Sequence, residues 1–191
     1  MNIYEFIKSR RTIRKFRQDE LSVEQLNKYI DAARVAPSAA NIQPLKYVVV
    51  KSREMSEKMF PLVKWAGYLA PDYNPKEGER PTAYIVVCAD TTIRKAGYDM
   101  DIGAAVENMM LCALADNVGA CWMLSIDRDE IRKLLSIDEH LEISCVVAMG
   151  YLAETPKEAP VENGDIKYYL DETDTLCVPK RGMDDIVIKT V

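Results

Sequence analysis

The fold of this chain is decided by one long apolar stretch, Asp99-Met-Asp-Ile-Gly-Ala-Ala-Val-Glu-Asn-Met-Met-Leu-Cys-Ala-Leu-Ala-Asp-Asn117. Its apolar residues fall on nearly every side of a helix, and that pattern is typical of a helix buried on all sides. In a chain of 191 residues, such a helix forms the centre of the protein or packs against a second subunit, and both explanations stay open. We expect Gly119 to stop this helix.

Short apolar strands and amphipathic helices alternate on either side of this stretch. Ser22 and Gln25 have the spacing of a capping box, in which each side chain satisfies a backbone N–H at the start of a helix. The alternation predicts a sheet covered by helices, in one domain over residues 1–191 with a polar C-terminal extension from about residue 156. The predicted strands are 47–50, 83–88, 120–124, 143–149 and 186–191, and the predicted helices are 4–11, one that begins after Ser22, 54–65 and 127–135.

Composition excludes several classes of protein. The chain has 25 Lys and Arg against 30 Asp and Glu, a net charge of −5, whereas a general nucleic-acid binder needs a basic face. The apolar run 109–115 is far shorter than the roughly 20 residues of a membrane span, and charges fall where a signal peptide has its apolar stretch. We therefore expect a cytoplasmic protein with no nucleic-acid or membrane partner.

Cysteine and histidine usage argues against a metal centre. The five cysteines are scattered without a C-x-x-C pair, so we expect reduced thiols, several of them in the core. The single histidine, His140, follows a polar turn and is interpreted as an exposed loop residue. The glycines form neither G-x-G-x-x-G nor a P-loop. If the protein is an enzyme, its chemistry belongs to a cofactor held in some other way.

Two basic clusters are candidate anion sites. Arg10-Arg-Thr-Ile-Arg14 places three guanidinium groups and a hydroxyl in one short stretch, and Lys180-Arg181 lies near the C-terminus. Guanidinium forks match phosphate oxygens bidentately. A solvated basic helix end explains the first cluster equally well.

Two loops are candidate ligand-binding segments. The loop 37–44 carries Asn41 and Gln43, whose amides both donate and accept hydrogen bonds, as the edge of a heterocycle such as a flavin requires; an ordinary turn is the alternative. The stretch 67–81 is rich in Pro, Gly and charge, and loops of that length are usually functional or mobile.

Six short motifs in a fixed order resemble the nitroreductase family of FMN-dependent oxidoreductases, in its short form. The resemblance runs from Ile3 to about Ile188. It implies an α+β, three-layer fold with a central, mostly antiparallel sheet flanked by helices, assembled as an intertwined homodimer with FMN at the subunit interface. The motifs are R-R-T-I-R-K-F at 10–16, A-P-S-A-A-N-I-Q-P at 36–44, D-I-G-A-A-V-E-N at 101–108, G-A-C-W at 119–122, G-Y at 150–151 and P-K-R at 179–181.

The same resemblance implies the cofactor-binding residues. One group grips the FMN phosphate and ribityl chain, a second reaches the flavin from the partner subunit, and a third runs beside the isoalloxazine ring, with a backbone N–H near Leu124 facing N5. The first group is Arg10, Thr12 and Arg14, with Arg11 close by and with Arg181 and Lys180 completing the phosphate site; the second is Ser38, Ala39, Asn41 and Gln43; the third is Met123 and Leu124.

By this resemblance the protein is an enzyme that transfers electrons from NAD(P)H to a small acceptor such as a nitroaromatic or quinone, by a ping-pong mechanism. Flavin N5, and no side chain, carries the chemistry, and no metal is required. Two alternatives stay open: a flavin-binding or flavin-sensing protein without turnover, and another chemistry of the same fold, such as reductive dehalogenation or flavin fragmentation. We expect the dimer to be obligate, with Met109 facing the interface and residues 162–191 embracing the partner.

Overall fold

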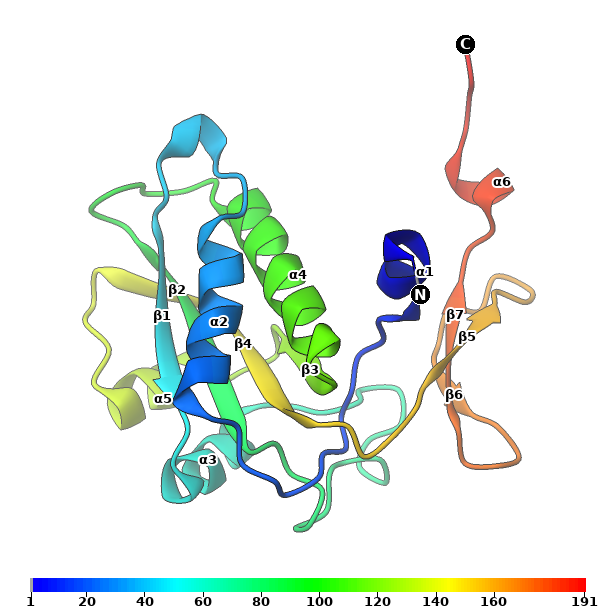
Figure 1. The fold of residues 1–191 in the computed structure, drawn as a ribbon, viewed down its shortest axis with the longest axis horizontal. Helices are drawn as coiled ribbons and strands as arrows, with labels where there is room; N and C mark the ends of the chain where they lie inside the picture. Colours follow the sequence, from blue (N-terminus) through cyan, green and yellow to red (C-terminus); the bar gives the residue numbers. More distant parts are fainter. Residues whose placement is uncertain (1) are drawn as a thin grey trace.

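A four-stranded antiparallel sheet lies at the centre of the computed structural model, which describes residues 2–191 (Figure 1). The strand order is β1-β2-β4-β3, so β1 and β3 form the two edges. The register between β2 and β4 shifts between Val87 and Cys88, where a bulge interrupts the ladder. The strands are β1 (Leu45–Val50), β2 (Ala83–Asp90), β3 (Val118–Met123) and β4 (Leu141–Tyr151).

Each face of the sheet has its own apolar core. Along β2, Ile85 and Val87 belong to one core, whereas Tyr84 and Val86 belong to the other. Every residue of β2 is buried, because successive side chains of a strand point to opposite faces and both faces are covered. This explains why the strand was recognisable as a continuous apolar run.

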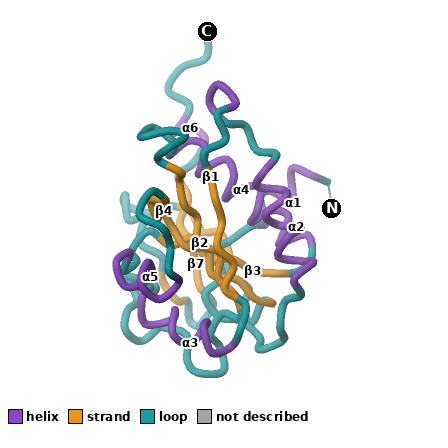
Figure 2. The backbone as a smooth tube through the Cα atoms, turned by 90° about the vertical axis from the view of Figure 1, so that its left-hand side faces the viewer, coloured by secondary structure: helices purple, strands orange, loops and turns teal. Residues whose placement is uncertain are grey.

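Helices cover both faces and complete three layers. The helices α2 (Val23–Arg34) and α4 (Asp99–Ala115) pack on one face. The other face is covered by α3 (Arg53–Met59), η2 (Phe60–Leu62) and α5 (Arg128–Leu135). Figure 2 shows the strands between α2 on the right and α5 on the left, with α3 below them.

Local signals set most helix starts. Ser22 and Gln25 form the predicted capping box, and the Asp127 side chain accepts the N–H of Glu130 at 3.1 Å. The predicted helix 54–65 ends earlier, at Met59, because Pro61 directs the chain into the short turn η2.

The role predicted for Gly119 is wrong. Helix α4 ends at Ala115, and Asn117 makes the turn with a φ of 59°. Gly119 lies inside β3, where a Cβ atom would come 2.7 Å from the Ile13 Cβ. Glycine is needed at this position because another backbone passes close by.

The orientation predicted for Met109 is also wrong. Met109 is fully buried among the side chains of the protomer's own core. The half-exposed side of α4 is a different stripe, and its spacing of three and four residues places it on one helix face. We call this face, formed by Ala104, Glu107, Leu111 and Leu114, the α4 stripe.

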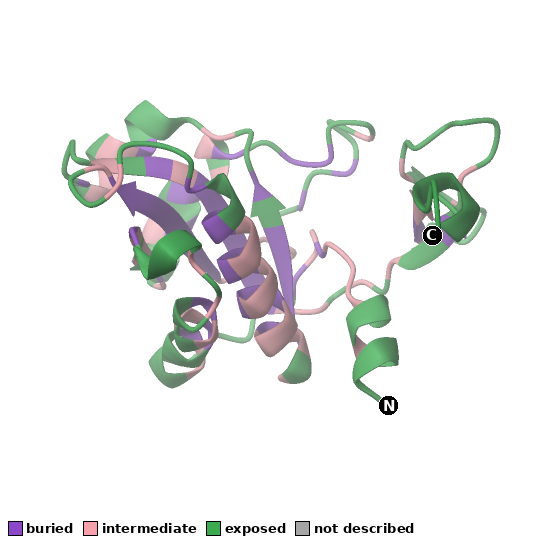
Figure 3. Ribbon diagram, turned by 90° about the horizontal axis from the view of Figure 1, so that it is seen from above, coloured by how far each residue is buried: buried purple, intermediate pink, exposed green. Residues whose placement is uncertain are grey.

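The N-terminal helix and the C-terminal segment stand apart from this body. Helix α1 (Ile3–Ser9) has no buried residue and lies between the body and residues 157–191, which we call the arm (Figures 1 and 3). The arm has its own three-stranded sheet, in the order β5-β7-β6, followed by a short helix. Its elements are β5 (Lys157–Pro160), β6 (Tyr169–Leu170), β7 (Leu176–Lys180) and α6 (Met183–Ile186).

The strand predicted at 186–191 is not formed in the single chain. Helix α6 ends at Ile186 and the following residues adopt no regular element. Ile188 and Val191 are fully exposed, at 96% and 103%. A β-strand requires a neighbouring strand to pair with, and the described part of this chain gives this segment none.

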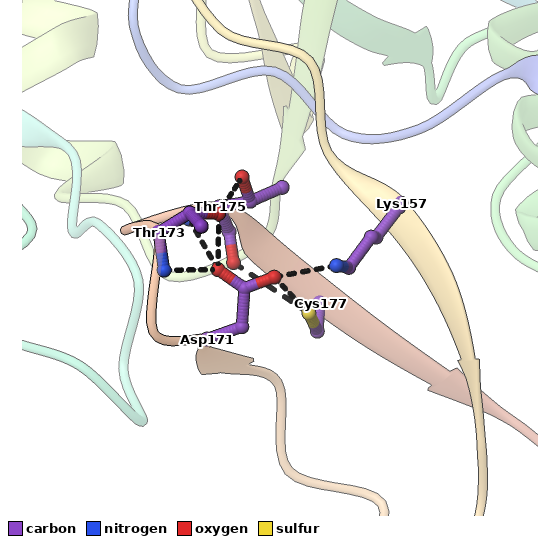
Figure 4. A network of polar contacts seen from close by, with 5 residues as sticks. All are labelled: Lys157, Asp171, Thr173, Thr175 and Cys177. Carbon is purple, nitrogen blue, oxygen red and sulfur yellow. Dashed lines mark hydrogen bonds and ion pairs between the residues drawn. The ribbon is translucent and has the colours of Figure 1, made fainter.

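A carboxylate holds the arm's sheet together (Figure 4). Asp171 accepts the N–H groups of Thr173 at 2.9 Å and Thr175 at 3.0 Å and forms an ion pair with Lys157. The Lys157 ammonium, followed by the threonine donors, lowers the pKa of Asp171 well below its usual range. Polar bonds therefore supply order where the arm has little apolar core.

We predict that Gly119→Ala destabilises the protein by about 1–3 kcal/mol, the usual cost of forcing extra volume into a packed site. Ile13 leaves no room for the added methyl group. Urea unfolding at a fixed protein concentration measures the change. Gly67→Ala is the control, since no atom lies within 4 Å of its added Cβ; equal stability of both variants would contradict the close approach.

We predict that Asp171→Asn loosens the arm at neutral pH but not in acid. A lowered pKa means that the ionised Asp171 stabilises the fold above the unfolded pKa of about 3.9 and loses this effect as pH falls further. Hydrogen exchange at the amides of Thr173 and Thr175 should therefore be faster in the variant at pH 7 and converge with wild type in acid. Asp174→Asn, at an exposed turn residue, should match wild type at both pH values.

Candidate functional site

The segment that carries Arg10, Arg11, Thr12 and Arg14 is fixed against the edge of the sheet. The Ile13 N–H donates to the Ala120 carbonyl at 3.0 Å, and the Arg17 N–H donates to the Tyr151 carbonyl at 2.8 Å. Ile13 is buried, whereas the predicted binding residues around it are half-buried. The sheet thus holds the backbone, and the arginine and threonine side chains remain partly accessible.

Each of the first two arginines meets a carboxylate from a different part of the chain. The Arg10 Nε lies 3.1 Å from Glu107 Oε1 on the α4 stripe, and Arg11 forms an ion pair with Glu158 on β5. The side chains of Glu107 and Glu158 are 42% and 50% exposed. The Arg10 and Arg11 side chains are 24% and 12% exposed, so each pair has an accessible carboxylate and a largely covered guanidinium. An incoming anion that accepts from the same guanidinium donors would compensate for the carboxylate it replaces.

The donor set of this segment fits a phosphate group. The Arg11 Nε is buried and has no hydrogen-bond partner among the described residues, although a buried donor is normally paired. A hollow of about 60 Å³ lies beside Arg10 and Arg11, over α4 and the start of β3. An unpaired guanidinium donor in a residue that lines a hollow is suited to a phosphate, which brings several strong acceptor oxygens.

Glu154 ties this segment to the excursion at 67–81, a connection that sequence reasoning missed. One carboxylate oxygen accepts the backbone N–H groups of Arg14 and of Lys15, the latter at 3.2 Å, and the other accepts the Tyr73 hydroxyl. Burial and the Glu154 carboxylate raise the pKa of Tyr73, so this hydroxyl remains a donor. The position of the excursion and the position of Arg14 are therefore coupled.

Tyr168 makes a second link between the arm and the site. The Arg14 guanidinium carbon lies 4.8 Å from the centre of the Tyr168 ring, a cation–π distance. The Tyr168 hydroxyl accepts the N–H of Tyr68, whose ring lies 4.9 Å from the Tyr168 ring. An aromatic pair of this kind has no sequence signature, because its members are 100 residues apart.

The loop with Ser38, Ala39, Asn41 and Gln43 lies at the other end of the body. It contains η1 (Ala39–Asn41) and is mostly exposed. Figure 1 shows this loop beyond the far end of α2, well away from α1 and the segment that follows it. Within one protomer, the predicted flavin-edge residues and the predicted phosphate residues are not brought together.

At the end of β3, the candidate binding residues Met123 and Leu124 differ in how far their side chains are exposed. Met123 is 4% exposed and belongs to the core, whereas Leu124 is 64% exposed. The Leu124 carbonyl accepts a weak hydrogen bond from Arg128 at 3.4 Å. Any role of Met123 toward a ligand is therefore limited to its main chain.

Lys180 and Arg181 lie at the exposed end of β7 on the arm. The arm contacts the arginine segment through Glu158, whose register partner on β7 is Val178, two residues before Lys180. Both basic clusters thus belong to the same region, but the described contacts do not join them directly.

His140 is exposed, as predicted, and the five cysteines are free thiols. No group of three or more His, Cys, Asp or Glu side chains within residues 2–191 is arranged to hold a metal ion. Over the same residues, no helix is both long and apolar enough to cross a membrane.

Comparisons with known proteins agree on one family. A family model described as the nitroreductase family matches residues 7–151. A candidate NADH dehydrogenase/NAD(P)H nitroreductase of Archaeoglobus fulgidus is 38% identical over 152 residues, which cover 76% of this chain and 82% of that protein.

Solved structures confirm the predicted fold. The structure of a candidate NADH dehydrogenase/NAD(P)H nitroreductase from Parabacteroides distasonis has a TM-score of 0.68 and 25% identity, over 88% of this chain and 96% of that one. An FMN-dependent nitroreductase from Clostridium difficile R20291 has the same fold at a TM-score of 0.68 and 24% identity, over 81% of this chain and 90% of that one. The three-layer α+β architecture with a mostly antiparallel sheet is thus the one predicted.

Proposed function

This chain belongs to the nitroreductase family, and on that premise we propose that it is an FMN-dependent oxidoreductase that uses NAD(P)H to reduce a small organic acceptor, such as a nitroaromatic or a quinone. The observation that carries the proposal is the arginine segment at residues 10–14. It is fixed to the sheet, it has an unpaired buried donor in Arg11, and its carboxylate partners are exposed.

We assign the binding roles as follows. Two sets of donors hold the phosphate and ribityl chain, a loop of the partner subunit supplies amides to the flavin edge, and the main chain at the end of β3 borders the ring. The first sets are Arg10, Arg11, Thr12 and Arg14 with Lys180 and Arg181; the loop residues are Ser38, Ala39, Asn41 and Gln43; the β3 residues are Met123 and Leu124.

Bound FMN would supply the redox chemistry, which is to accept a hydride from NAD(P)H and to pass electrons on to the acceptor. The chain contributes binding, orientation and the exclusion of water, and no side chain is required as an acid or base. Glu154 and Tyr73 hold the excursion 67–81 against the arginine segment, so this excursion borders the site and is placed to limit which acceptors enter. Because both substrates use one site, they react in turn, in a ping-pong cycle.

The protein acts as a homodimer in this proposal, as one domain per chain with the arm clasping the partner. Three features of the single chain support a partner: the half-exposed α4 stripe, the exposed apolar end at Ile188 and Val191, and the separation of the 38–43 loop from the arginine segment. The first two features are surfaces that the protomer leaves uncovered, and the third is a binding site whose two parts lie apart. In this proposal a second copy of the chain covers the two surfaces and brings its own 38–43 loop to the arginine segment.

The proposed function is tested by the flavin and its reduction. Purified protein, or protein incubated with FMN, should show the flavin absorbance in the visible range, and this absorbance should fall on addition of NADH or NADPH without oxygen. Continued NAD(P)H oxidation in the presence of a nitroaromatic or quinone is expected. Protein that takes up no FMN would refute the proposal, and FMN binding without turnover would favour the flavin-binding alternative.

We predict that Arg10→Ala and Arg14→Ala each weaken FMN binding. A charge-assisted hydrogen bond is typically worth about 1.5–3 kcal/mol, so the dissociation constant should rise by roughly 10- to 150-fold. Fluorescence titration of the flavin-free protein measures the constant. Arg17→Ala, at an exposed arginine three residues beyond this segment, should bind FMN as wild type does; unchanged affinity in both test variants would make the cluster an ordinary basic helix end.

We predict that Leu111→Glu dissociates the dimer and releases FMN together. The substitution places a carboxylate on the α4 stripe, and burying an unpaired carboxylate costs more than the roughly 2–7 kcal/mol of an unpaired neutral polar group. Light scattering and the flavin absorbance of the same fractions provide the two readouts. Val23→Glu, at an exposed position of α2, is the control; a Leu111→Glu dimer with full flavin content would show that the stripe is not the interface.

A further inference from the structure

The Ser38–Gln43 loop adopts a backbone that is unfavourable without support. Ala40, Asn41 and Gln43 have φ values of 52°, 54° and 55°. This is the left-handed region, which most residues with a Cβ atom avoid; none of the three is glycine, and of the three only Asn41 is of a type that adopts this region readily. Three such residues within four positions persist only where surrounding contacts determine the conformation.

Asp101 supplies those contacts from the first turn of α4. Its Oδ2 accepts the Ser38 hydroxyl at 2.6 Å, and its Oδ1 accepts the Ala39 N–H at 3.3 Å. The Ser38 Oγ in turn accepts the Gln43 N–H at 2.9 Å. A chain of hydrogen bonds therefore runs from one carboxylate to both ends of the strained loop.

The carboxylate is costly in its location, so its presence needs a reason. Asp101 is 4% exposed, and its cationic neighbour, Arg94, places Nη1 at 3.8 Å from Oδ2, the long end of an ion pair. The N-terminal turn of a helix favours a negative charge. Even so, a buried ion pair generally adds little to the stability of a fold. The groups that Asp101 binds belong to the loop, so the loop is what this carboxylate serves to hold.

We propose that Asp101 is a positioning residue that keeps the Ser38–Gln43 loop in its flavin-binding shape. It touches no reacting atom; it acts through Ser38 and Ala39 on the amides of Asn41 and Gln43. The Gln43 Nε2 donates to the Asn41 carbonyl at 3.0 Å, so the two outward residues are already joined before a ligand arrives. The assignment of this loop to the flavin rests on the proposed function.

The loop also walls a hollow of about 150 Å³ that includes Asp101, Tyr47 and Ala105. Burial raises the pKa of Tyr47 to about 12, so this neighbour is uncharged at neutral pH and adds no repulsion to the carboxylate. Of the charged neighbours, Arg94 forms the ion pair with Asp101. The loop thus has one anionic anchor, and a single substitution can remove it.

The test compares Asp101→Ala, Asp101→Asn and Ser38→Ala with the control Asp99→Ala, an exposed acid on the same helical turn. The first readout is hydrogen exchange of the amides of Ala39 and Gln43 in the flavin-free protein. The second is the FMN dissociation constant. Ser38→Ala removes the bridge but keeps the Asp101 carboxylate, its Ala39 N–H donor and its Arg94 neighbour in place, so it provides a second test if Asp101→Ala folds poorly.

We expect Asp101→Ala and Ser38→Ala to speed exchange at Gln43 and to raise the FMN dissociation constant by about tenfold, the effect of one lost hydrogen bond to a charged group. Asp101→Asn retains an acceptor and should fall between these variants and wild type. Global unfolding of the flavin-free protein should change less than the loop does.

Exchange and FMN affinity equal to those of Asp99→Ala would overturn the proposal. Loss of FMN affinity with unchanged exchange at Ala39 and Gln43 would also overturn it, because the loop would not have moved. If wild type binds no FMN, the proposed function fails, and the exchange readout alone decides whether Asp101 positions the loop.

Discussion

The structure depends on the close approach of residues 13–17 to the edge of the sheet. A Cβ atom at Gly119 would lie 2.7 Å from Ile13, and one at Gly150 would lie 3.0 Å from Phe16. Glycine, which has no side chain, is therefore required at both positions. Main-chain hydrogen bonds from Ile13 and Arg17 then join this segment to β3 and β4. The backbone position of Arg14 follows from that contact, and Arg10 and Arg11 come just before it in the chain.

From this contact the site extends outward through charged and aromatic links. Glu154 joins the backbone at Arg14 to Tyr73 in the excursion, and Tyr168 joins the Arg14 side chain to the arm. These links are individually modest. Together they fix three segments that are distant in sequence around one group of cationic donors, and they leave the amide loop at 38–43 at the far end of the protomer.

Local features of the fold could be predicted from the sequence, and features set by packing could not. The capping box at Ser22 and the buried strand at 83–88 depend on neighbours a few residues away, and both are confirmed. A glycine after an apolar helix predicts a helix stop, but the constraint on Gly119 is Ile13, 106 positions earlier in the chain. Helical periodicity shows that α4 is apolar all round but not which side meets the sheet, so Met109 was assigned to the wrong face.

The candidate site shows the same division. The residue types of the arginine cluster and of the amide loop mark both as candidate binding segments. Their roles come from the family resemblance and remain proposals. Glu154 and Asp101 were missed because a carboxylate that organises a backbone loop looks like any other acid in sequence. The strand predicted at 186–191 is not formed, because β-branched composition predicts an extended segment but cannot supply the neighbouring strand that a sheet requires.

The central claim, that each flavin site combines the arginine segment of one chain with the amide loop of the other, is tested most directly by a mixed dimer. One chain carries Arg10→Ala with Arg14→Ala, the other carries Asn41→Ala with Gln43→Ala, and the two are co-expressed with different tags. Each parental dimer has two damaged sites. If the sites are shared, the mixed dimer has one site with all four substitutions and one intact site, and it should bind one FMN with wild-type affinity. If each chain builds its own site, the mixed dimer will have no tight site, and the account is contradicted.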